Sequence, residues 1–263
     1  MTDTPTPMEV PDSEVMLLQP RHADYVLVIP VINEGERIRK QLRTLFELRP
    51  PVDVVLADGG STDGSLAPEF LTSVGCRALL VKRGPGKLGA QLRMAYAWAL
   101  REGYKGIVTV DGNGKDGLAA IASFVDKLKD GFDYVQGSRY VPGGRAVNTP
   151  LDRKLAGRLI HAPVLSLCGR HWYTDTTNGF RAYSARYLLD PRVAPFRNVF
   201  THYELLFYLT VRAGQLGYRV TELPVERRYP AGEKTPTKIS GFAGRIQMLR
   251  QLFAAALGRF NPR

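Results

Sequence analysis

The chain has 263 residues, 44% of them hydrophobic, which suits one large α/β domain with a substantial core. Its two cysteines, Cys76 and Cys168, lack C-x-x-C spacing, which excludes a disulfide framework and a thiolate zinc site and favours a reducing cytoplasm. The formal net charge is +11, and the excess of positive charge lies in residues 138–263, which carry 20 Lys and Arg against 7 Asp and Glu. We therefore expect this half to bind something anionic. The candidates are nucleic acid, a phospholipid surface and a phosphorylated small molecule.

The first 24 residues are predicted to form a disordered tail. Their opening stretch, MTDTPTPMEVPDSEV, has neither the basic n-region nor the apolar h-region of a signal peptide. No apolar run in the chain approaches the roughly 18 residues that cross a bilayer. We therefore expect a cytoplasmic protein whose membrane contact, on the inner face, would be peripheral.

From Tyr25 the sequence alternates short β-branched runs with longer amphipathic stretches, a pattern typical of βαβ units around a mainly parallel sheet. The predicted strands are 25–29, 53–57, 78–81, 106–110 and 134–136. The predicted helices are 36–48, 65–74, 89–102 and 118–129, each with apolar residues three and four positions apart. Right-handed crossovers bring the carboxyl ends of the strands to one edge, where ligands bind in open sheets.

Polar residues follow three of these strands at that edge: Asn33 and Glu34, then Asp58 and Asp63, then Asp111 and Asp116. Any one of them could cap a helix or form a turn. We favour a binding role for Asp58 and Asp111 because each directly follows a buried apolar strand. The turn from Asp111 to Asp116 also offers two carboxylates and the Asn113 carbonyl, oxygen ligands that Mg²⁺ or Mn²⁺ prefers, although a capped turn would have the same sequence.

After Gly137 the pattern changes. Helices are predicted at 151–168 and 201–214, a strand at 218–224, and a polar loop rich in Pro, Gly and cations at 227–238. Residues 239–263 should form a C-terminal amphipathic helix, with an apolar stripe made of Ile246, Leu249, Phe253, Leu257 and Phe260. Such a helix covers the core of domain 25–238 or, since arginines accompany the stripe, lies on an anionic membrane.

Six segments occur in one order along the chain: IPVINEGERI (29–38), LADGGSTDGS (56–65), VDGNGKDG (110–117), GSRYVPGG (137–144), TDTTNGFRAYS (174–184) and ERRYPAGEKTPTKIS (226–240). In this order they resemble family 2 glycosyltransferases, and among these the dolichyl-phosphate or polyprenyl-phosphate mannosyltransferase branch. The resemblance covers about Tyr25 to Phe253. It implies a GT-A fold and an inverting, metal-dependent transfer of a hexose from a GDP- or UDP-linked sugar to a polyprenyl phosphate.

The resemblance also implies roles for individual residues. It places the nucleotide sugar against Pro30, Asn33, Glu34, Asp58, Gly60, Lys87, Asp111, Arg227, Arg228 and Lys234, the last three in a basic loop over the diphosphate. It places Mg²⁺ or Mn²⁺ at Asp111 with Asn113 or Asp116, and the acceptor phosphate at Arg139. A role for Glu204, which follows the G-F-R segment, is left open.

Two positions depart from the family pattern. Gly59 stands where a second Asp is common in D-D-G-S, and Asn113 stands where the second Asp of D-x-D is usual. The second departure removes a metal-ligating charge, which Asp116 would have to replace.

The acceptor side is predicted from the chemistry of transfer. A hydroxyl acceptor needs a carboxylate base, whereas a lipid phosphate is already an anionic nucleophile and needs positioning cations. The C-terminal half is rich in Arg and poor in carboxylates, so a phosphate acceptor fits better. Candidate phosphate ligands are Arg139, Arg145, Arg153 and Lys154, the last two being equally consistent with a solvated helix face. For a glycolipid or soluble hydroxyl acceptor, Asp175 is the candidate base.

Three other functions fit parts of the sequence. Residues 84–89 satisfy G-x-G-x-x-G, but the motif follows the third strand and Pro85 removes an amide donor, which disfavours a nicotinamide-dependent oxidoreductase. The basic half contains no recognised nucleic-acid module, so no nucleic-acid partner is expected. Asn113 suggests the third, a catalytically inactive relative that only binds a sugar nucleotide. The donor base, the acceptor and the oligomeric state are not predicted.

Overall fold

A computed structural model describes residues 8–230 and 241–262 of the chain, and its framework is an eight-stranded mixed sheet. The strand order is β1-β4-β3-β2-β5-β8-β6-β9. The bounds are β1 Ser13–Leu17, β2 Tyr25–Val31, β3 Asp53–Asp58, β4 Ala78–Lys82, β5 Gly106–Thr109, β6 Tyr134–Ser138, β8 Arg181–Ser184 and β9 Val220–Pro224. Strands β2, β3, β4 and β5 run parallel, as predicted, so their carboxyl ends share one edge.

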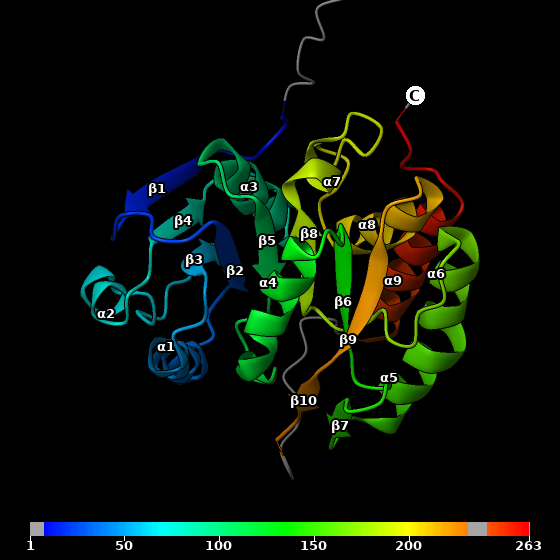
Figure 1. Ribbon diagram of the computed structural model, residues 1–263, viewed down its shortest axis with the longest axis horizontal. Coiled ribbons are helices and arrows are strands. Elements are labelled where there is room, and N and C mark those ends of the chain that lie inside the picture. Colours follow the sequence, from blue (N-terminus) through cyan, green and yellow to red (C-terminus); the bar gives the residue numbers. More distant parts are fainter. Residues whose placement is uncertain (1–7, 231–240, 263) are drawn as a thin grey trace, which may run out of the picture.

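Helices cover both faces of the sheet (Figure 1). Their bounds are α1 Glu36–Leu48, α2 Pro68–Ser73, α3 Leu88–Arg101, α4 Ile121–Lys129, α5 Leu151–Ala156, α6 Ala162–Gly169, α7 Ala185–Leu189, α8 Glu204–Gln215 and α9 Gly241–Ala256. Side chains of β2 alternate between two buried clusters. Val26 and Val28 pack with residues of α3 and α8, whereas Leu27 and Ile29 pack with residues of α1 and α4. This two-sided burial explains the continuous apolar runs of the strands.

The prediction of a disordered tail up to residue 24 is wrong for strand β1. Ser13–Leu17 pairs antiparallel with β4, at the edge of the sheet. All five of its side chains are exposed, so the strand has no buried face and therefore no alternation of polar and apolar residues to reveal it. Residues 1–7 lie outside the described part of the chain.

Three further strands were not predicted. Strand β8 lies between β5 and β6 and is antiparallel to both, and β7 (Arg145–Val147) pairs with β10 (Glu226–Arg228) in a separate two-stranded sheet. The predicted loop 227–238 therefore begins with strand residues, and its residues 231–238 lie outside the described part. The predicted helix 151–168 is present as α5 and α6 joined by a π-helical turn, η2 (Gly157–His161).

The C-terminal helix is confirmed as α9, which packs on α6 and α8, but its predicted apolar stripe is partly wrong. The buried residues are Leu252, Ala255 and Ala256, whereas Phe253 and Leu257 are exposed. None of the described helices is long and apolar enough to cross a bilayer.

His161 gives the fold a specific pH dependence. Burial lowers the pKa of this histidine to about 4, below the ordinary value of 6.5. The unfolded chain therefore takes up a proton between pH 6.5 and 4 that the folded chain does not, and stability falls as the pH falls through this window. We expect a loss of about 2 kcal/mol between pH 7 and 5. His161→Gln should remove most of this loss in urea unfolding, and exposed His22→Gln should not. Equal slopes for all three proteins would contradict the assignment.

Candidate functional site

The loops after β2 and β3 are fastened to each other by hydrogen bonds. The Asn33 backbone N–H donates to Ser61 Oγ (3.0 Å), and the Thr62 N–H donates to Asn33 Oδ1 (2.8 Å). Buried Asp58, at the end of β3, accepts from the Ser61 N–H (2.9 Å) and hydroxyl (2.6 Å). Gly60 has a φ of +96°, a conformation that favours glycine. Asp58 and Gly60 therefore shape the turn in which nucleotide binding is predicted.

Two other predicted nucleotide residues belong to the first loop and its strand. Pro30 is the penultimate residue of β2, and Glu34 forms an ion pair with Arg37 of α1 at 3.0 Å. The loop is also tied to its neighbour by Asp63, whose Oδ2 accepts from the Gly35 N–H at 2.8 Å. Asp63 therefore serves the loop structure, in line with its turn-forming sequence.

The glycine-rich segment 84–89 packs against the start of α8. The Lys87 backbone N–H donates to the Thr201 carbonyl (2.8 Å), and the Lys87 side chain is exposed. A Cβ on Gly89 would lie 2.6 Å from the His202 carbonyl oxygen. This glycine, in the first turn of α3, thus permits close packing against the loop before α8, which accounts for the motif without a dinucleotide.

A buried arginine joins the two predicted metal carboxylates. Arg227 Nη1 donates to both oxygens of Asp116 (2.7 and 2.9 Å), and Nη2 donates to Asp111 Oδ2 (2.8 Å). The Asp116 side chain is 1% exposed and that of Asp111 is 32% exposed. Burial alone would raise the pKa of Asp111, but the charge of Arg227 holds it below the ordinary value. Asp111 is therefore an ionised carboxylate with part of its surface open.

Strand β10 decides which of two candidate arginines reaches this carboxylate. Neighbouring residues of a strand point to opposite faces. Arg227 points inward, whereas Arg228 is exposed and pairs with Glu226 at 2.8 Å. Lys234, the third predicted diphosphate residue, lies outside the described residues.

The donor set fits a divalent ion whose coordination is completed by a substrate. Among the described residues, no group of three or more His, Cys, Asp or Glu side chains could hold a metal by itself. Asp116 has both oxygens bonded to Arg227. Asn113 makes only longer contacts, because its Oδ1 accepts from the Lys115 N–H and its Nδ2 donates to Asp111 Oδ2, each at 3.3 Å, so Asp111 and Asn113 are the better-placed ligands in this arrangement. Mg²⁺ at phosphate-binding sites is held by one or two carboxylates together with substrate oxygens. Asp111 with Asn113 suits that kind of site, and Asp116 anchors Arg227.

On the other side of the site, Arg139 and Asp175 form a buried ion pair. Arg139 donates through Nε and Nη2 to the two Asp175 oxygens (2.7 and 2.9 Å), and through Nη2 to Thr177 Oγ1 (2.7 Å). Asp175 also accepts from the Thr177 N–H (3.2 Å). Nearby Glu222 accepts from the Thr174 N–H (2.8 Å) and hydroxyl (2.9 Å). Both carboxylates are thus acceptors in structural networks.

The ring of Tyr229 lies between the two clusters. The guanidinium groups of Arg227 and Arg153 lie 5.8 and 5.9 Å from its centroid, and Lys115 Nζ lies at 5.1 Å. Burial would raise the pKa of Tyr229, but the Arg227 charge brings it below its ordinary value. Arg153, predicted to hold acceptor phosphate, is therefore at the site rather than on a solvated face.

Sequence reasoning missed residues that complete this geometry. Gly179, within N-G-F-R, is required because a Cβ there would collide with Asp111 Oδ1. Gln41 of α1 holds the metal-binding turn by donating to the Asp111 carbonyl (3.1 Å) and accepting from the Gly114 N–H (2.9 Å). The N-G-F-R motif was a signal for Gly179, and Tyr229 lies within the segment 226–240 singled out above, whereas Gln41 lies in none of the six segments.

Glu204 organises the loop before α8. Its Oε1 accepts from the His202 N–H (2.7 Å) and from the Thr201 hydroxyl (3.0 Å). Its Oε2 is buried and has no hydrogen-bond partner among the described residues. Glu204, to which the sequence analysis assigned no role, is therefore a carboxylate that holds the loop before α8 in place.

Comparison with known proteins adds independent information. The sequence profile described as Glycosyl transferase family 2 matches residues 26–190. The chain is 29% identical over 241 residues to a polyprenol monophosphomannose synthase from Mycolicibacterium smegmatis, covering 90% of this chain and 88% of that one. It is 30% identical over 219 residues to an undecaprenyl-phosphate mannosyltransferase from Micrococcus luteus, covering 81% of this chain and 86% of that one.

Solved structures share the fold. Glucosyl-3-phosphoglycerate synthase from Mycobacterium tuberculosis, crystallised with Mn²⁺, UDP-glucose and phosphoglyceric acid, matches with a TM-score of 0.58 at 20% identity, over 91% of this chain and 80% of that one. A second mycobacterial protein matches with a TM-score of 0.61 at 18% identity, over 91% of this chain and 75% of that one. The predicted GT-A architecture is confirmed by these neighbours.

Removal of the Asp116 carboxylate should show that it supports the fold of the site. Asp116→Ala leaves the buried Arg227 with one partner instead of two, so we expect a loss of about 3 kcal/mol in the free energy of unfolding. Glu226→Ala is the matched control, because its pair with exposed Arg228 should contribute less than about 1 kcal/mol. Urea unfolding followed by circular dichroism measures both. Equal losses for the two variants would show that Arg227 does not depend on Asp116.

Proposed function

The chain belongs to glycosyl transferase family 2, and from this premise we propose that it transfers a hexose from a GDP- or UDP-linked sugar to a polyprenyl phosphate, with inversion. The chain is a glycosyltransferase, and the relatives named above act on polyprenyl phosphates. One observation of the site favours a phosphate acceptor over a hydroxyl acceptor. Asp175, the candidate base, is bonded to Arg139 and Thr177, and so is a poor proton acceptor for a hydroxyl.

A phosphate acceptor needs no such base, because its oxygen is already anionic at neutral pH. What it needs is cations in fixed positions. Arg139 is held rigidly by Asp175, and Arg153 lies on α5 beside Tyr229. We assign the acceptor phosphate to these two arginines. A glycolipid or soluble hydroxyl acceptor is the second candidate, and for it Asp175 would first have to leave its ion pair.

In the proposed reaction an acceptor phosphate oxygen attacks the anomeric carbon from the side opposite the nucleoside diphosphate. The bond from that carbon to the diphosphate oxygen breaks, and its electron pair stays on the departing diphosphate. The new bond to the acceptor oxygen forms on the opposite face, which inverts the configuration. No proton transfer is required, and the residues contribute mainly by position and charge.

On the donor side, the turn around Asp58 and Gly60 and the loop with Asn33 and Glu34 are assigned to the nucleoside. Asp111 with Asn113 would hold Mg²⁺ or Mn²⁺, which when bound neutralises charge on the diphosphate. Arg227 lies against Asp111 and is assigned to the same diphosphate. Lys87, Arg228 and Lys234 remain predictions for this side.

The donor assignment is tested by Asp111→Ala. Loss of the carboxylate should lower metal-dependent transfer about 100-fold or more, because several kcal/mol of charge stabilisation depend on the ion. Calorimetric titration of UDP and GDP, each with and without Mn²⁺, should show metal-enhanced binding of one nucleotide to the parent protein and none to the variant. Asp126→Ala, which removes an exposed carboxylate of α4 away from these loops, is the control. Full activity in Asp111→Ala would remove the metal assignment.

The acceptor class is tested with a matched pair of lipids. Transfer from the preferred sugar nucleotide to a short-chain polyprenyl phosphate should proceed, and transfer to the corresponding free polyprenol should not. Its rate should be nearly flat between pH 6.5 and 8.5, since no base is titrated. Efficient transfer to the polyprenol would favour the hydroxyl-acceptor alternative. Binding of nucleotide without transfer to either lipid would favour an inactive relative.

A further inference from the structure

The helical segment from α5 through η2 to α6 carries an exposed apolar row. Leu151, Leu155, Leu159 and Leu167, here called the leucine face, are between 48% and 76% exposed. Single exposed leucines are ordinary on protein surfaces, but several on one segment mark an interaction site. The opposite side of the segment is buried through residues such as His161, Leu165 and Gly169. The leucine face is therefore a second apolar side of a helix whose first is already packed.

The π-helical turn reduces the rotation between these leucines. Their positions differ by multiples of four residues, and in an α-helix each step of four advances about 40° around the axis. Over the sixteen residues from Leu151 to Leu167 the row would wind away from its starting side. The turn Gly157–His161 has i→i+5 hydrogen bonds and rotates less per residue, which offsets part of this drift.

The surface around the leucine face is basic. Segment 151–170 contains Arg153, Lys154, Arg158 and Arg170 and a single carboxylate, Asp152. That carboxylate is paired with Arg245 of α9 at 2.8 Å. Exposed leucines among cations are the composition of helices that lie in the headgroup region of anionic bilayers. An acidic protein partner would satisfy the cations but not the aliphatic side chains between them.

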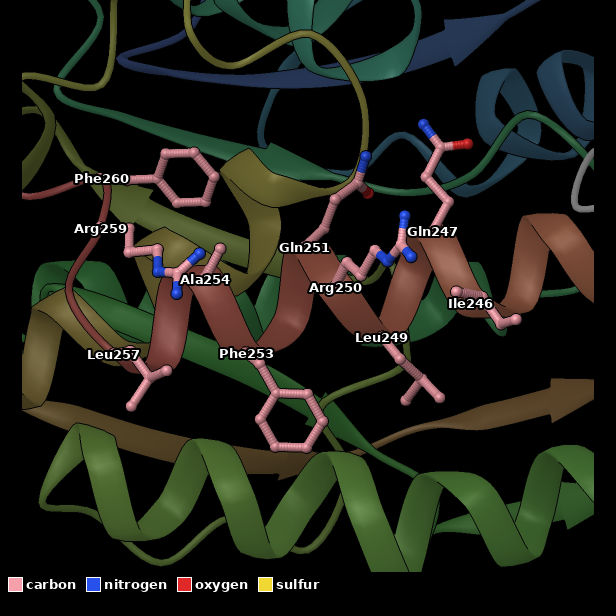
Figure 2. Close-up of a pocket in the computed structure, with 10 residues that line it drawn as sticks. All are labelled: Ile246, Gln247, Leu249, Arg250, Gln251, Phe253, Ala254, Leu257, Arg259 and Phe260. Atoms are coloured by element: carbon pink, nitrogen blue, oxygen red, sulfur yellow. The ribbon is translucent and has the colours of Figure 1, made fainter.

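Helix α9 extends the apolar surface. Figure 2 shows Leu249, Phe253 and Leu257 pointing from α9 toward the neighbouring helix, along a groove of about 690 Å³. Phe253 and Leu257 are themselves exposed. Arg250 lies on the same helix, and Arg259 lies in the turn that follows it. In Figure 1, α5, α6 and α9 occupy one side of the molecule, away from α1 and α2. The apolar and basic surface thus spans two adjacent helices.

The same segment borders the proposed acceptor site on its inner side. The Arg153 guanidinium lies 5.9 Å from the Tyr229 ring centroid, and that of Arg158 lies 5.1 Å from the ring of Tyr140, which also adjoins Arg139 (5.3 Å). A helix is about 10 Å across. A surface bound by the leucine face would therefore lie about one helix diameter from the arginines assigned to the acceptor phosphate.

We propose that the leucine face docks on the headgroup region of an anionic phospholipid bilayer and so holds the acceptor arginines at the level of lipid phosphates. The docking is inferred from the exposed leucines and the cations around them. Its role in presenting a lipid acceptor to the site rests on the proposed function. A lipid acceptor then reaches Arg139 without withdrawing its hydrocarbon chain from the bilayer. Removal of the leucines should weaken bilayer binding without changing the site.

The test uses the full chain and vesicles that contain no polyprenyl phosphate. Flotation with phosphatidylcholine vesicles containing 30% phosphatidylglycerol should recover bound protein, and 0.5 M salt or phosphatidylcholine alone should reduce the recovery. The double variant Leu159→Glu/Leu167→Glu should lower the partition coefficient about tenfold or more. The matched control, Leu48→Glu/Leu189→Glu, alters two exposed leucines on α1 and α7 and should bind like the parent.

Two further measurements make the outcome decisive. Transfer to a short, water-soluble prenyl phosphate should be the same in the leucine-face variant and the parent, whereas transfer to a long-chain acceptor in vesicles should fall. Failure of all transfer with vesicle binding intact would overturn the proposed function and leave the docking. Equal vesicle binding by the parent and both double variants would overturn the docking. So would a parent dimer in gel filtration that Leu159→Glu/Leu167→Glu converts to a monomer without any vesicle binding.

Discussion

The site depends on one buried guanidinium. Arg227 is bonded to Asp116 and to Asp111, which lies 116 residues away in the sequence, and so ties strand β10 to the turn after β5. Loss of Arg227 would leave both carboxylates without their cation, and loss of Asp116 would leave the buried guanidinium with one partner. Either change should be far more costly than loss of an exposed ion pair. The turn that presents Asp111 is therefore part of the fold, and the open third of the Asp111 surface is set in place before any ligand arrives.

The proposed acceptor side also contains a buried pair of an arginine and a carboxylate, but there the carboxylate is the residue that holds its partner in place. Asp175 is bonded to Arg139 and Thr177, so this carboxylate fixes the position of the arginine to which we assign the acceptor phosphate. On the donor side Arg227 is bonded to two carboxylates, and the partly exposed one, Asp111, is the residue to which we assign the metal. Tyr229, between them, contacts cations from both sides. Part of the positive charge of the C-terminal half therefore lies in pairs and contacts at the site and along α5.

The sequence predicted the strands and the edge they form because burial on two faces leaves long apolar runs in the sequence. It did not predict β1, whose side chains are all exposed, nor the pairing of β7 with β10, which depends on residues some 80 positions apart. Candidate site residues could be named from the sequence, but the side chains that hold them in place could not. Asp116 resembled a spare metal ligand, and its partner Arg227 lies 111 positions away, where Arg228 is an equally good candidate by sequence. The need for glycine at position 179, within N-G-F-R, arises only from its closeness to Asp111, which the sequence does not reveal.

The segment α5–η2–α6 has to satisfy two surfaces at once. On its inner side, a Cβ added to Gly157 would lie 3.4 Å from Thr177, which bonds Arg139, and His161 is buried against Phe207. Its outer side presents leucines in steps of four. A regular α-helix would rotate one of these sides away from its surface over the length of the segment, because 3.6 residues per turn does not match a step of four. A π turn is uncommon and poorly stabilised by itself. Its position between Arg153 and Leu167, at the point where the two requirements diverge, is consistent with a helix shaped by the acceptor site on one side and by a lipid surface on the other.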